Sequence, residues 1–222
     1  MAITIAGSST GLAITTTPTL PVTTKAGDVI IISVGSANAN WNAVTVSGAG
    51  ATWIPLSNSA SPYTYYNGNW FAIGYNCSAG QTSVTLTSNP STTGGMVITV
   101  LSGAATTAPT KLFGPIQNTT AGAAATTSGL AWNAGQTLIS FGESYTWSNT
   151  TSPVSTWAGT TATSVGVGAS LRQGYIDYIL SAPSTQTSAT YTSPTPSGST
   201  YAGVVYGYAF TPKSSSNFLA FC

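Results

Sequence analysis

The chain has 222 residues, of which 42% are hydrophobic and only 3% are charged, and its formal net charge is +1. This apolar content excludes a disordered chain, and the longest fully aliphatic run, residues 29–32, is too short to span a membrane. The chain has no histidine and only three scattered acidic residues, and its four cations form no basic patch, so we expect no enzyme, no metal or cofactor and no nucleic-acid partner.

The N-terminal segment, residues 1–18, precedes the first long apolar run. Its apolar side chains alternate with small polar ones around a flexible stretch at 7–11, and they are Ile3, Ile5, Leu12 and Ile14. The alternation breaks phase between Ile5 and Leu12. We expect a strand without an evident partner in its own chain, and the alternative is a local hairpin closed by the 7–11 loop and paired within its own sheet.

Residues 19–222 are predicted to form one all-β domain, an Ig-like or jelly-roll-like β-sandwich, because β-branched residues and turn formers abound and no long helical periodicity is present. The candidate strands, in chain order, are 28–35, 43–47, 52–56, 62–67, 69–77, 82–88, 95–101, 111–117, 136–142, 154–158, 163–172, 174–181, 187–192 and 201–211.

An internal repeat relates about 26–101 to 134–210. The clearest match aligns residues 73–79 and 81–88 with residues 176–182 and 186–193, in the same order and with similar spacing. Either half alone would expose one face of its strands, so we expect two similar halves that share a core and are joined by 102–133.

Alternation along the repeated strands assigns their faces. Cys77 is predicted to be buried, and Ile176, Tyr178 and Leu180 are predicted to point inward while Asp177 points outward.

The only two cysteines are Cys77 and Cys222. In an exported chain these two cysteines predict a disulfide that fixes residues 217–222. Closing such a loop raises the free energy of unfolding by roughly 5 kcal/mol in the chain-entropy model. A bridge between subunits and two free thiols are the alternatives.

Three sequons for N-glycosylation are usable, at Asn76, Asn118 and Asn149, whereas Pro90 blocks the one at Asn89. Ser and Thr are so frequent that chance alone could supply this number. Their positions at a strand end and in apparent loops would let glycans hydrate a surface that has few charges.

Aromatic residues cluster around the turn at 67–68: Tyr63, Tyr65, Tyr66, Trp70 and Phe71. They predict either a platform on which sugars stack or ordinary core and cross-strand packing.

Few groups can titrate in acid, and a pair drawn from Asp28, Glu143 and Asp177 is the one catalytic alternative left open. Acid would neutralise only these three side chains and a terminus, so we expect stability to be nearly independent of pH. Such a chain would suit a hot, acidic exterior, where ion pairs are lost.

Taken together, the extended N-terminal segment, the charge-poor sandwich rich in Thr, Ser and Ala and the sequons resemble the subunit of archaeal thread filaments. These filaments are similar to bacterial chaperone-usher pili in linking subunits by donor-strand complementation. The resemblance implies an extracellular, cell-surface homopolymer used in adhesion, in which residues near 2–17 enter a neighbouring subunit and Ile3, Ile5, Leu12 and Ile14 fill its pockets.

Other parts of the pattern are also similar to β-sandwich domains of secreted and virion proteins: residues 26–28 before an aliphatic run, and Thr52-Trp53 in the next hairpin. A virion coat or decoration protein and a secreted carbohydrate-binding module are therefore the alternative functions.

The resemblance also implies a lock by isopeptide bonds. Lys25, Lys111 or Lys213 would supply the amine to an Asn or Asp side chain and Glu143 the nearby acid, whereas free surface lysines are the alternative.

Overall fold

The computed structural model describes residues 1–36, 44–57, 69–87, 94–117, 124–145, 155–165, 172–193 and 204–214. These parts confirm the predicted all-β class, because every regular element in them is a strand. The strands are β1 (Thr4–Leu12), β2 (Val29–Ser36), β3 (Val46–Ser47), β4 (Thr52–Ser57), β5 (Asn69–Tyr75), β6 (Thr85–Leu86), β7 (Gly94–Ser102), β8 (Thr110–Gln117), β9 (Ala125–Trp132), β10 (Thr137–Tyr145), β11 (Thr156–Trp157), β12 (Thr160–Thr161), β13 (Thr163–Val165), β14 (Arg172–Ile179), β15 (Gln186–Ser193) and β16 (Val204–Phe210).

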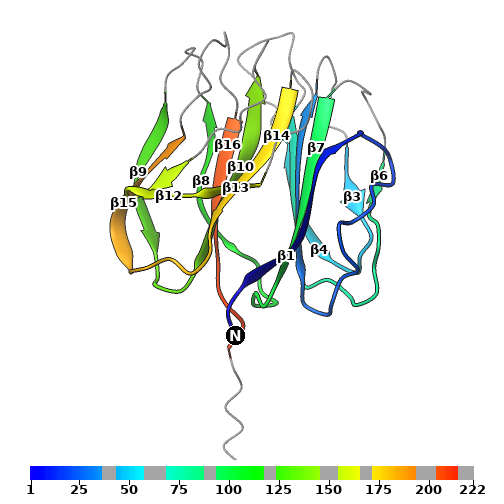
Figure 1. Cartoon of the computed structure of the whole chain (residues 1–222), viewed down its shortest axis with the longest axis horizontal. Helices are drawn as coiled ribbons and strands as arrows, with labels where there is room; N and C mark the ends of the chain where they lie inside the picture. The colour runs from blue at the N-terminus through cyan, green and yellow to red at the C-terminus, as the bar shows by residue number, and fades with distance from the viewer. Residues whose placement is uncertain are drawn as a thin grey trace, which may run out of the picture.

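The largest sheet consists of two antiparallel runs with the same order of strands. The first run is β4-β5-β2-β7, with β1 on the free edge of β7. The second is β13-β14-β10-β16-β8. A single parallel pairing, Gln173 with Gly95, joins β14 to β7. Figure 1 shows the first run on the right and the second on the left.

Each run is covered on its outer side by a smaller sheet. The pair β3-β6 lies over the first run and the sheet β12-β11-β15-β9 over the second. β9 was not among the predicted strands and lies in the segment 102–133 that was expected to join the two halves. Its buried residues are Leu130 and Trp132. The architecture is therefore layered, with both large runs on the inside.

Both faces of the inner strands are buried, which explains the continuous apolar run in β2. Ile30 and Ile32 pack toward β3-β6, whereas Val29 and Ile31 pack in a central core that includes residues of the second run. Alternation is lost when a sheet is covered on both faces. For this reason the face assignment was wrong in the second run, where Asp177 is fully buried and Leu180 is 38% exposed.

Two turns in the two runs make the same hydrogen bonds. The amide of Lys25 donates to Asp28 Oδ2 over 2.8 Å, and the amide of Asn133 donates to Gln136 Oε1 over 2.8 Å. Asp28 also accepts from Ser102, at the end of β7, and Gln136 donates to the residue after β16. These matches favour the proposed internal repeat and extend it, since β1 and β8 hold equivalent places beside β7 and β16.

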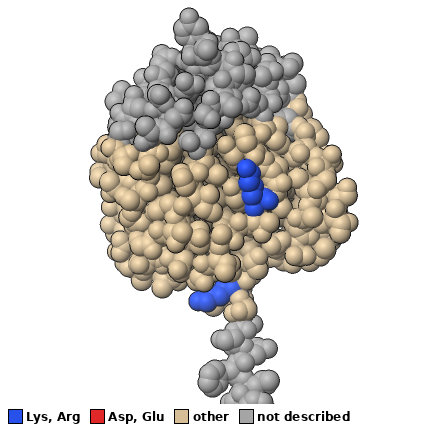
Figure 2. Space-filling model, turned by 180° about the vertical axis from the view of Figure 1, so that it is seen from behind, with Lys and Arg blue, Asp and Glu red and all other residues tan. Residues whose placement is uncertain are grey.

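The described surface carries few charges. Among the described side chains, both acidic residues, Asp28 and Asp177, are buried, and the lysines Lys25, Lys111 and Lys213 are exposed. The view from behind shows a face that is almost entirely uncharged (Figure 2). No helix in the described part of the chain is long and apolar enough to cross a membrane.

Candidate functional site

The N-terminal strand and the edge of β7 that receives it form the first candidate site. β1 pairs antiparallel with β7 of its own chain, from Thr4 opposite Ser102 to Leu12 opposite Met96. The 7–11 stretch lies inside this strand instead of closing a hairpin. A strand therefore forms as expected, but the expectation that it lacks a partner in its own chain was wrong, because β1 pairs with the edge of β7.

Two register shifts in β1 split its apolar side chains between two cores. They lie between Ile5 and residue 7 and between residue 9 and Leu12, where the sequence alternation also breaks phase. Ile3 and Ile5 pack in the central core, whereas Leu12 and Ile14 pack in the core under β3-β6. Ile3 and Ile14 are each only 5% exposed, so the strand is fastened at both ends.

Close backbone contacts also seat this strand. A Cβ at Gly103 would lie 2.4 Å from the carbonyl oxygen of Ala2, and a Cβ at Gly7 would lie 2.6 Å from Val22 Cγ1. Only glycine allows such an approach at Gly103, whose φ is +88°. We call the edge of β7, together with Gly103 and Val22, the β1 seat. It suits main-chain pairing with small residues.

Two of the other edge strands carry features that discourage pairing with other chains, whereas β9, at the edge of its outer sheet, carries none. β4 contains Pro55, and β8 contains Lys111 and Pro115, whereas β1 has neither proline nor charge. Prolines and lysines on edges block strand addition. β1 is therefore an edge strand of nine residues without such protection.

A buried polar cluster forms the second candidate site. Asp177 Oδ2 accepts hydrogen bonds from the amide of Ser155, at 3.1 Å, and from its hydroxyl. The same hydroxyl lies 3.0 Å from the Tyr191 hydroxyl and 3.2 Å from that of Ser140. Asp177 Oδ1 has no partner in the described part of the chain. These groups come from β10, β14, β15 and the residue before β11, and sequence reasoning did not bring them together.

Burial raises the pKa of Asp177 to about 6, although the hydrogen bonds from Ser155 act in the opposite direction. No cation compensates this carboxyl among the described contacts, and Asp177 is fully buried. The members of the cluster are buried from solvent, so we expect the cluster to affect stability. The described residues contain no group of three His, Cys, Asp or Glu side chains that could hold a metal ion.

Cys77 lies in the core under β3-β6 with 2% exposure and has no disulfide partner among the described residues. Burial, followed by the nearby charge of Asp28, raises its pKa to about 12. Cys222 lies outside the described residues, so the predicted bridge stays a prediction.

We expect this thiol to react very slowly while the chain is folded. At about pH 8 a shift of the pKa from 9 to about 12 lowers the thiolate fraction on the order of a thousandfold. Alkylation by iodoacetamide of a Cys222→Ser variant, followed by mass spectrometry, measures the effect on Cys77 alone. In urea the rate should rise by at least about a hundredfold, and similar rates in both conditions would contradict the buried placement.

Of the three predicted glycosylation residues, Asn76 is exposed at the end of β5 with a φ of +56°, and Asn118 and Asn149 lie outside the described residues. Of the aromatic residues around the 67–68 turn, Trp70 and Phe71 are fully buried, as the alternative of core packing predicted. Tyr63, Tyr65 and Tyr66 lie outside the described residues.

The residues proposed for an isopeptide bond are not seen together. The side chain of Glu143 lies outside the described set, and Lys111 Nζ lies 5.5 Å from the ring centre of Tyr206. The isopeptide bond stays a prediction.

Comparisons with known proteins return nothing: no protein-family model, no curated protein and no solved structure matches this chain.

Proposed function

We propose that this chain is the structural subunit of an extracellular surface filament, in which β1 of one subunit pairs with β7 of the next. The observation that carries the proposal is the seat of β1: nine residues without charge, paired along one edge and anchored by apolar side chains at both ends. A strand from a neighbouring subunit would make the same main-chain bonds.

Strand exchange of this kind would polymerise the chain. β1 and the β7 edge are different surfaces, so the contact is head-to-tail and does not close on itself. Residues 15–17 are in no strand and join β1 and its anchor Ile14 to the rest of the sandwich, so they would serve as the hinge. Glycans at Asn76, and at Asn118 and Asn149, would add hydration to the neutral surface.

A pair of engineered cysteines tests the exchange. Ser8 and Thr99 are direct partners on β1 and β7, with their hydroxyls 3.2 Å apart. In a background with Cys77→Ala and Cys222→Ser, the Ser8→Cys/Thr99→Cys variant should give a ladder of covalent multimers on a non-reducing gel after assembly. Exchange puts the two cysteines of each bridge in different subunits.

The matched control uses Thr126 and Thr192, which are partners on β9 and β15 with hydroxyls 3.4 Å apart. Thr126→Cys/Thr192→Cys should give bridged monomers alone, because these strands stay within one subunit. Electron microscopy of the same samples should show fibres. Fibres in which the Ser8/Thr99 bridge is confined to monomers would overturn the exchange of β1.

A further inference from the structure

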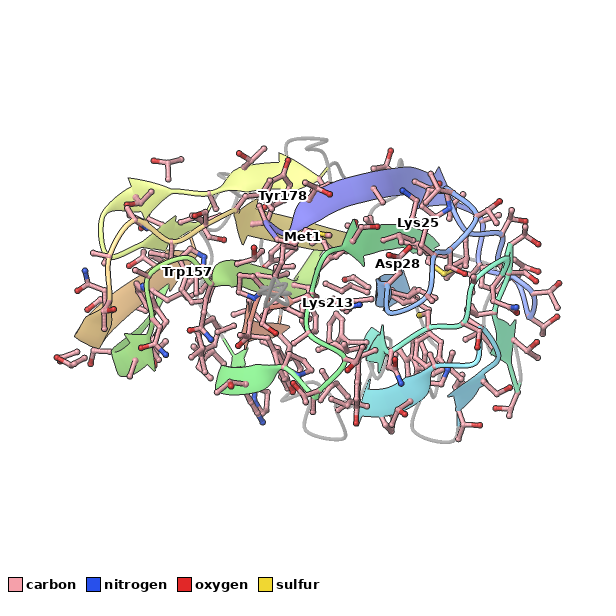
Figure 3. The ribbon with its side chains drawn as sticks, turned by 90° about the horizontal axis from the view of Figure 1, so that it is seen from below. Met1, Lys25, Asp28, Trp157, Tyr178 and Lys213 are labelled. Carbon is pink, nitrogen blue, oxygen red and sulfur yellow. The ribbon has the colours of Figure 1, made fainter. Side chains whose placement is uncertain are left out.

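A pocket opens at one end of the outer sheet of the second run. Its cavity volume is about 110 Å³, and its floor consists of the buried residues Trp132, Leu138 and Trp157. Thr160, Ser184 and Gln186 stand at its rim. Figure 3 shows Trp157 among the strands of the second run, far from the Lys25 and Asp28 turn of the first.

The two indoles in the floor lie edge to face, with ring centres 5.8 Å apart and planes at 82°. Trp157 is 1% exposed, and its Nε1–H has no hydrogen-bond acceptor in the described part of the chain. An unpaired buried donor costs about 1–3 kcal/mol. Most buried polar groups are paired, so an orphan beside a pocket needs an explanation.

The first run has smaller residues at the two positions that correspond to these indoles. Trp157 pairs with Tyr191 on the second run, and Val46 pairs with Leu86 at the matching place on the first. The matching turns place Thr24 where the second run has Trp132. The indole pair is therefore not required by the sandwich itself, because the first half folds with Val and Thr at these positions.

The lining restricts the chemistry of an occupant. None of the residues that line the pocket is charged, so an ion would lose its hydration without compensation. An apolar aromatic floor with hydroxyl and amide groups at the rim suits a ring that has a C–H face and several hydroxyls. One water needs about 10–15 Å³ of this kind of volume, so the space admits one such ring and not a long oligomer.

We propose that this pocket binds one neutral sugar ring, with the Trp157 indole N–H donating to a sugar oxygen after a small movement of the floor. Gln186 and Ser184, which are hydrogen-bonded to each other at 2.7 Å, supply polar contacts at the rim. This site is distinct from the β1 seat, because its lining residues all belong to the second run and its outer sheet. A subunit could thus carry one surface for assembly and another for weak adhesion to glycans.

Nuclear magnetic resonance of the indole N–H groups tests the proposal on the full chain. Glucose, galactose and mannose are each titrated to about 100 mM, because a site this small predicts millimolar affinity. The Trp157 cross-peak, assigned with Trp157→Phe, should shift and saturate with at least one of them. No saturable shift with any of the three sugars overturns the proposal and leaves an ordered water as the partner of the N–H.

Two variants separate binding from folding. Gln186→Leu keeps the side-chain volume at the rim and should weaken the affinity about fivefold, as expected for lost hydrogen bonds. The matched control is Trp53→Phe in the first run, since the Trp53 indole N–H already donates to the Gly48 carbonyl over 3.1 Å. Trp53→Phe should leave the affinity unchanged. A shift that survives unchanged in Gln186→Leu, or that falls equally in Trp53→Phe, places the sugar elsewhere.

Discussion

The free energy of unfolding should be about 3 kcal/mol higher at pH 3 to 4 than at pH 8, because of Asp177 alone. The pKa of this carboxyl is about 6 in the folded chain and about 3.9 in an unfolded one. Between these values the folded state holds one more proton. The stabilisation is therefore complete below the unfolded pKa and is lost as the pH rises through about 6.

Asp177→Asn isolates this contribution. The amide keeps an oxygen that can accept from Ser155 and removes the titration, so urea midpoints of the variant should vary much less with pH. Asp28→Asn is the matched control: the equivalent turn already functions with the amide of Gln136, so the variant should fold and keep the rise in acid. An equally steep rise in Asp177→Asn would contradict the assignment to this carboxyl.

This prediction changes what the scarcity of charge implies. From composition alone, few titrating groups suggest a stability that is nearly independent of pH. A single carboxyl that is fully buried has a larger effect than several exposed ones, because burial penalises its charged form. The chain is expected to be most stable in acid, which contradicts the expectation of a stability that is nearly independent of pH.

The sequence predicted the class of the fold and most inner strands, because long apolar runs such as that of β2 mark strands wherever they pack. It could not assign faces in β14, since alternation identifies an inner face only if the other face meets water. Asp177 was placed outside for that reason. The clue available in the sequence was β2 itself: residues 29–34 are apolar on both faces apart from Ser33.

Recognition of the candidate sites depended on how local their signals were. The broken alternation between Ile5 and Leu12 is a local pattern, and it reappears as the register shifts of β1. The cluster around Asp177 and the pocket around Trp157 draw residues from strands far apart in sequence, and no spacing rule brings them together. The proposed repeat did not include β1 and β8, because these strands share few residue types and correspond only in their pairing.

Replacing Gly174 with Ala should destabilise the chain by about 2–3 kcal/mol, the usual cost of overpacking a close contact. Gly174 lies on β14 where the second run meets β2 of the first, and an added Cβ would be 2.4 Å from the Ser33 carbonyl oxygen and 2.6 Å from its carbon. Both are backbone atoms, so no side-chain rotation can relieve the clash. The Ser33 hydroxyl donates to the Gly142 carbonyl at the same junction over 2.8 Å.

Two controls separate this clash from other effects. Gly80→Ala adds a methyl group where nothing lies within 4 Å, so its cost should be only that of a left-handed backbone, about 1 kcal/mol. Ser33→Ala removes the donor to Gly142 and should also cost about 1 kcal/mol. If urea unfolding gave Gly174→Ala no greater loss than Gly80→Ala, the two runs would not approach each other as closely as described. A larger loss means that the two runs can pack closely only if a residue without a side chain stands at this junction. Only glycine lets the backbone of β14 come this near to the backbone of β2 at Ser33.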